Sequence, residues 1–190
     1  MSINIKLFIH LLCSVLCAAV VATAADADPK TAWKQILQER IPLYGHRNWI
    51  VIADSAYPAQ SRDGIETIVS GASQIEVLKQ VLADLSSSRH IRPIIYTDRE
   101  LSFVNEADAA GVDHYRQQLS VLLPKATVTS LPHEEIINKL DQAGQTFRVL
   151  IIKTDLTIPY TTVFLQLDCA YWSAEAERKL RAMMARKSGH

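Results

Sequence analysis

The chain has 190 residues, 48% of them hydrophobic, which is enough for one globular domain with a substantial core. Twenty basic and twenty acidic side chains cancel, and Lys and Arg form no cluster, so the composition argues against a nucleic-acid partner. No glycine-rich phosphate loop, G-x-S-x-G motif or H-E-x-x-H helix is present. Nucleotide hydrolysis, serine hydrolysis and zinc proteolysis therefore lose their usual support.

The first residues differ in character from the rest of the chain. Lys6 precedes an apolar run from Leu7 to Val21, and Ala22-Thr23-Ala24 has the small-residue pattern of a cleavage site. The run is shorter than the ~20 residues that a membrane-spanning helix needs. We therefore predict a signal peptide over residues 1–24 and a secreted or periplasmic protein, with an uncleaved anchor as the alternative. Its removal leaves Cys169 as the one cysteine, which we expect to be a small buried residue without a disulfide.

Apolar runs and amphipathic segments alternate along the remaining sequence. In chain order they predict a helix over 31–40, a strand over 49–53, a short strand over 66–69, a helix from the capping box of Ser73 and Glu76 to Ser86, a strand over 92–97, a helix over 112–122, a short strand over 127–129, a helix over 132–142, strands over 147–153 and 161–167, and a C-terminal helix over 173–187. This alternation predicts a three-layer α/β/α sandwich around a largely parallel sheet. We expect a single domain over residues 30–190, with the last helix as an extension.

The stretch from Tyr44 to Ser61 holds the candidate chemistry. It contains His46 in a turn, a short apolar strand, and Asp54 where that strand ends. Ligands of parallel sheets bind beyond the carboxyl ends of the strands, so Asp54 is well placed to meet a small molecule. His46 could fold over toward Asp54 or be supplied by a neighbouring chain. The plainer alternative is that His46 is a solvated side chain and Asp54 a cap of the following turn.

The remaining candidates are proton-handling side chains without a cofactor or a covalent nucleophile. Together with His46 and Asp54 they include His133, in the first turn of a predicted helix, and Tyr160. Opening a sugar ring at its anomeric carbon requires one proton to leave and one to arrive, which a histidine titrating near neutrality can perform. We expect no metal, because lone histidines far apart in sequence seldom form a metal site.

The same residues resemble a known family. Gly45-His46, an apolar strand and then Ala53-Asp54-Ser55-Ala56-Tyr57-Pro58-Ala59-Gln60-Ser61 are similar to the signature of the D-ribose pyranase and L-fucose mutarotase family (RbsD/FucU), leaning toward the fucose members. Tyr115-Arg116, His133-Glu134 and Ile151-Ile152-Lys153-Thr154-Asp155 leading to Tyr160 match in the same order. The resemblance extends over roughly residues 41 to 168.

The resemblance implies a role for each candidate. His46 matches the catalytic proton donor, and Asp54, His133 and Tyr160 match sugar contacts. Without the resemblance, His133 reads as a surface residue at a helix start, where the helix dipole favours a neutral imidazole. The family triplet Tyr-x-Asn ends here in Thr162, which offers one hydroxyl in place of an amide. Family members assemble as rings in which a neighbouring chain can complete the pocket, so a homo-oligomer is implied.

These features predict a cofactor-free mutarotase or pyranase that interconverts anomers or ring forms of a fucose- or ribose-like monosaccharide. One alternative is a non-catalytic periplasmic carbohydrate-binding or assembly protein that retains the pocket. Another is an unrelated acid/base enzyme, because one fold can host many activities.

Overall fold

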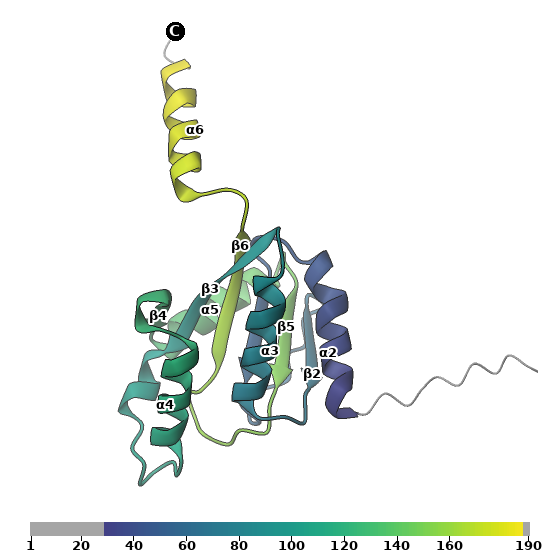
Figure 1. Ribbon diagram of the computed structural model, residues 1–190, viewed down its shortest axis with the longest axis vertical. Helices are drawn as coiled ribbons and strands as arrows, with labels where there is room; N and C mark the ends of the chain where they lie inside the picture. The colour runs from purple at the N-terminus through teal and green to yellow at the C-terminus, as the bar shows by residue number, and fades with distance from the viewer. Residues whose placement is uncertain (1–28, 188–190) are drawn as a thin grey trace, which may run out of the picture.

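A six-stranded sheet forms the centre of the molecule in the computed structural model, which describes residues 29–187 (Figure 1). The predicted signal peptide lies outside the described residues. The strands are β1 (Trp49–Ala53), β2 (Ile65–Val69), β3 (Ile91–Asp98), β4 (Val128–Leu131), β5 (Val149–Lys153) and β6 (Val163–Cys169), in the order β2-β5-β1-β6-β3-β4. β6 pairs antiparallel with β1 and β3, whereas all other neighbours pair in parallel. The predicted largely parallel sheet is therefore confirmed, with β6 as its one reversed strand.

Helices cover both faces of the sheet, which confirms the predicted α/β sandwich. They are α2 (Pro29–Arg40), α3 (Gln74–Ser86), α4 (Val112–Leu122), α5 (His133–Gly144) and α6 (Ala174–Lys187), with short 3-10 turns η1 (Ile41–Leu43), η2 (Arg99–Phe103) and η3 (Lys125–Thr127). The buried side chains of α2, α3 and α4 share one core cluster, and those of α5 belong to the other. α6 extends away from the layered body (Figure 1).

Alternation along the buried strands divides the core between the two faces. In β1, Ile50 and Ile52 belong to the cluster under α2, α3 and α4, while Trp49 and Val51 belong to the cluster under α5. All five residues of β1 are buried. A strand covered on both faces reads as a continuous apolar run, which is why the sequence located β1 correctly.

The predicted helix starts are also present in the structure. Ser73 is the N-cap of α3 and its hydroxyl accepts the backbone N–H of Glu76 at 3.3 Å. Pro132 is the N-cap of α5, so His133 is the first residue of that helix. Cys169 is free and only half-buried, because β6 ends there near the surface. None of the helices between residues 29 and 187 combines the length and apolarity needed to cross a bilayer.

Candidate functional site

Asp54 is held at the carboxyl end of β1 by two hydrogen bonds. Its Oδ1 accepts the backbone N–H of Ala56 at 2.9 Å, and its Oδ2 accepts the hydroxyl of Thr162 at 3.2 Å. Thr162 directly precedes β6, and because β6 runs antiparallel to β1, the start of β6 lies beside the end of β1. Thr162 is buried and contacts Asp54, so it acts on the site through the carboxylate.

A cavity of about 490 Å³ opens at this edge of the sheet. Asp54, Tyr57, His133, Ile137 and Tyr160 are among the residues that line it, whereas Thr162 is not. The volume falls within the range of ~300–1,000 Å³ that is typical of small-ligand pockets. Three of the predicted site residues, Asp54, His133 and Tyr160, therefore surround one hollow large enough for a single sugar ring.

Tyr160 has an unusual backbone conformation within this wall. Its φ is +58°, the left-handed region that costs most residues ~1–2 kcal/mol. The neighbouring carbonyl of Thr161 accepts hydrogen bonds from the amide of Gln74 and from the hydroxyl of Tyr115, the latter at 2.9 Å. Two buried side chains from α3 and α4 thus hold the carbonyl of the residue that follows Tyr160. Backbone strain held by its surroundings in this way is common at binding sites.

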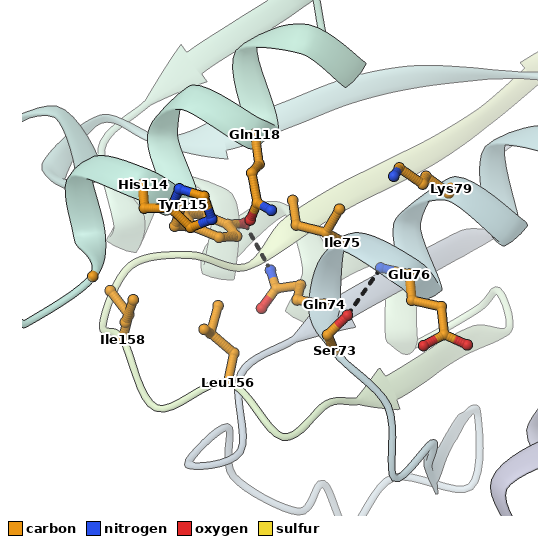
Figure 2. Close-up of a pocket in the computed structure, with 11 residues that line it drawn as sticks. Ser73, Gln74, Ile75, Glu76, Lys79, His114, Tyr115, Gln118, Leu156 and Ile158 are labelled. Carbon is orange, nitrogen blue, oxygen red and sulfur yellow. Dashed lines mark hydrogen bonds between the residues drawn. The ribbon is translucent and has the colours of Figure 1, made fainter.

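A second cavity, of about 430 Å³, lies between the N-terminal ends of α3 and α4 (Figure 2). Figure 2 shows Gln74 and Tyr115 pointing toward each other from the two helices, with Nε2 of Gln74 donating to the hydroxyl at 3.1 Å. These buried polar groups already have protein partners, and through the carbonyl of Thr161 they join the starts of α3 and α4 to the segment that contains Tyr160. Sequence reasoning did not identify Gln74, which reads as an ordinary first-turn residue of a helix.

His133 meets a buried carboxylate that sequence reasoning also missed. Nδ1 of His133 lies 3.1 Å from Oδ2 of Asp98, the last residue of β3, although neither atom has the angular geometry of a hydrogen bond. The Asp98 side chain is fully buried, whereas the His133 side chain is 32% exposed. The pKa of Asp98 is raised to about 6: burial is the largest cause, the facing imidazole of His133 opposes the rise, and the carboxylates of Glu100 and Asp54 add to it.

The backbone of His133 is held by the same turn that supplies Asp98. Its N–H donates to both carboxylate oxygens of Glu100, at 3.1 and 3.0 Å. Burial alone would raise the pKa of Glu100, but backbone hydrogen bonds and nearby positive charge outweigh it, so the pKa is lowered. A distant side chain therefore caps α5, since Pro132 has no side-chain group that can do so.

His46 lies at the opposite edge of the sheet. It is exposed, in the turn before β1, where the N–H of Arg47 donates to the carbonyl of Leu167 near the end of β6. Trp49 and Ala53, at the two ends of β1, are about 13 Å apart at ~3.3 Å per residue. Within one chain His46 does not reach the cavity, so the prediction that it folds over toward Asp54 is excluded and supply by a neighbouring chain remains.

Between residues 29 and 187, no three His, Cys, Asp or Glu side chains are grouped as ligands of a metal ion. The side chains at the cavity can donate, accept and exchange protons. Tyr57 adds a buried hydroxyl there that has no hydrogen-bond partner. Burial, followed by the nearby carboxylates of Asp141, Asp98 and Asp54, raises the pKa of Tyr57, so this hydroxyl acts as a neutral donor.

Comparison with known proteins gives one family match. Residues 17–169 match the RbsD / FucU transport protein family. The structure is similar to Bacillus subtilis RbsD complexed with D-ribose, with 22% identity, 73% of this chain and 92% of that chain covered, and a TM-score of 0.46. It is also similar to the fucose mutarotase from Streptococcus pneumoniae in complex with L-fucose, with 22% identity, 70% and 89% coverage, and a TM-score of 0.45. No curated protein sequence matches the chain.

Proposed function

The chain belongs to the RbsD / FucU transport protein family, and we therefore propose that it is a monosaccharide mutarotase or pyranase that uses acid/base chemistry without a cofactor. The observation that best supports the proposal is the convergence of Asp54, His133 and Tyr160 on one cavity at the carboxyl edge of the sheet. The substrate is a fucose- or ribose-like sugar whose anomers or ring forms interconvert.

The chemistry needs few groups. Ring opening moves the proton of the anomeric hydroxyl to a base and delivers a proton to the ring oxygen, and closure on the other face of the carbonyl reverses both transfers. Asp54 retains free lone pairs for sugar hydroxyls, because a carboxylate can accept about four hydrogen bonds and two are in use. His133 and Tyr160 orient the ring, and His46 exchanges the proton. Each positioned acid or base contributes typically ~10²–10⁴-fold.

We propose that His46 comes from a second copy of the chain. In a single chain the length of β1 separates it from the cavity, and it is exposed at the edge where a neighbour can be met. A ring or other closed homo-oligomer would bring the His46 edge of one subunit to the cavity of the next.

Saturation-transfer NMR on a panel of monosaccharides tests the activity. We expect anomer exchange that is lost in His46→Ala and retained in His114→Ala. His114 is an exposed histidine of α4 that lies outside the proposed site and serves as the matched control. Absence of exchange on every sugar would remove the proposal.

Mixing two inactive variants tests the shared site. His46→Ala and Asp54→Asn subunits, unfolded and refolded together, should regain about a quarter of the wild-type activity, since a randomly mixed ring pairs an intact His46 with an intact Asp54 at about a quarter of its sites. If both residues served the same site from one chain, every site would carry one defect and no activity would return.

A non-catalytic carbohydrate-binding protein is the second candidate. The distance of His46 from the cavity within one chain favours it, because a monomer would bind sugar without a proton donor. Calorimetric sugar binding by a protein that sediments as a monomer and catalyses no exchange would support this candidate in place of the enzyme.

A further inference from the structure

Several buried polar atoms at or beside the cavity make no well-aligned hydrogen bond, although two of them, Nδ1 of His133 and Oδ2 of Asp98, lie 3.1 Å apart. In the part of the chain that the structure describes they include both carboxylate oxygens of Asp98, Nδ1 of His133 and the hydroxyl of Tyr57. Such atoms are rare in folded proteins, since each costs ~1–3 kcal/mol when left unpaired. Hydrogen bonds at active sites are often poorly aligned without substrate and tighten when it binds. We therefore ask whether this cluster forms well-aligned hydrogen bonds when a ligand binds in the cavity.

The arrangement of the ring limits which nitrogen can meet a ligand. Nδ1 of His133 is buried and faces Asp98, while about a third of the side chain is exposed and lines the cavity. The ring therefore presents its Nε2 side to the cavity. An ionised carboxylate has only acceptors, so it favours a proton on the nitrogen that it faces.

Arg116 of α4 and Lys125 of η3 line a separate cavity together with Asp98, but neither is among the largest causes of the pKa shift of its carboxyl. The titratable groups that act on its carboxyl are His133 from α5, Glu100 from η2 and Asp54 after β1. Burial is the largest cause that raises the pKa of Tyr57 and of Tyr115, and the negative charge of Asp98 raises both further. The imidazole is the one group among these that lowers the pKa of the carboxyl.

We propose that Asp98 is a positioning residue that holds His133 in the tautomer with hydrogen on Nδ1, so that Nε2 meets the sugar as a hydrogen-bond acceptor. The proposal rests on the proposed function in that the cavity ligand is a sugar, whose hydroxyl would donate to Nε2. Glu100 complements Asp98 by holding the backbone of the same residue. The turn at the end of β3 thus fixes the backbone position of His133 through Glu100 and its tautomer through Asp98.

Two-bond ¹H–¹⁵N spectra of the histidine rings at about pH 8 test the proposal without any sugar, because neutral imidazole tautomers give distinct patterns. His133→Gln identifies the signal. We expect Nδ1–H in the wild type, and Nε2–H in Asp98→Asn, whose amide can donate to Nδ1. Glu100→Gln is the matched control: it removes a charge from the same turn and should keep Nδ1–H. A wild-type ring with hydrogen on Nε2 would overturn the proposal, and this reading does not depend on the folding of the Asp98 or Glu100 variants.

Exchange kinetics on an accepted sugar give the second reading. We expect Asp98→Asn to weaken sugar binding, seen as a KM increase of about 10–100-fold with a smaller change in kcat, by analogy with the loss of carboxylates that orient metal-binding histidines. A reversed tautomer with unchanged KM would also overturn the positioning role. If no sugar is turned over, the proposed function fails while the ring spectra still decide the tautomer.

Discussion

Replacing Asp98 by asparagine should change how the free energy of unfolding depends on pH. Burial is the largest cause that raises the pKa of this carboxyl from 3.8 to about 6 in the folded protein. The folded chain therefore binds the proton more tightly than the unfolded chain. This contributes stability that is fully present below about pH 4 and is lost as the pH rises through about 6.

The size of the effect follows from the two pKa values. The difference between 3.8 and about 6 corresponds to ~3 kcal/mol of unfolding free energy. Asparagine cannot ionise, so the variant escapes this loss. The free energy of unfolding of Asp98→Asn minus that of the wild type should therefore grow by ~2–3 kcal/mol between pH 4 and pH 7, whatever its value at pH 4.

Urea titrations at a series of pH values measure this difference, with the fluorescence of the buried Trp33 and Trp49 as the signal. Asp168→Asn is a control of opposite sign. Although burial raises the pKa of Asp168, the hydrogen bond and charge of Arg92 outweigh it and the pKa is lowered. The free energy of unfolding of the wild type minus that of Asp168→Asn should thus increase as the pH rises. A difference between Asp98→Asn and wild type that stays constant from pH 4 to 7 would refute the reasoning.

Three further changes have expected outcomes. Gly64→Ala would place a Cβ 2.7 Å from the carbonyl oxygen of Gly144 and should lower the free energy of unfolding by about 1–3 kcal/mol. Gly45→Ala is the control and should cause no such loss, because the space around Gly45 is open. Equal losses for the two variants in urea titrations would contradict this prediction. Tyr160→Gly should raise stability by up to ~1 kcal/mol, because glycine accepts a positive φ, while calorimetry finds sugar binding lost; a destabilised variant would argue against strain at this residue. A chain ending at Ser173 lacks α6 and should keep its unfolding free energy within ~0.5 kcal/mol, since α6 extends away from the sheet; a larger drop would reveal a stabilising contact.

The strands could be predicted from the sequence because each central strand is a run of apolar residues. The runs at 49–53 and 149–153 pair side by side in the structure. The direction of β6 was not predicted, since apolar composition does not encode it. The connection did contain a signal: residues 154–162 hold no helix, and a parallel crossover usually needs a dozen or more residues with one.

The site could be predicted in part. Asp54 follows a buried strand, and the rule that ligands meet the carboxyl ends of strands puts it at that edge of the sheet, where it lines a cavity together with His133 and Tyr160. The same rule applies to Asp98, but the strand predicted over 92–97 stops one residue before it, whereas β3 ends at Asp98. Its burial and its contact with His133 depend on packing between β3 and α5, which no local pattern encodes.

The reversed strand also affects how the protein must be made. β6 lies between β1 and β3, yet it is the last strand to leave the ribosome. Until then, β1 and β3 each have an unpaired side, and such open edges invite pairing between nascent chains. Messages truncated before codon 163 should therefore yield aggregating fragments, and complete synthesis is the step that closes the sheet.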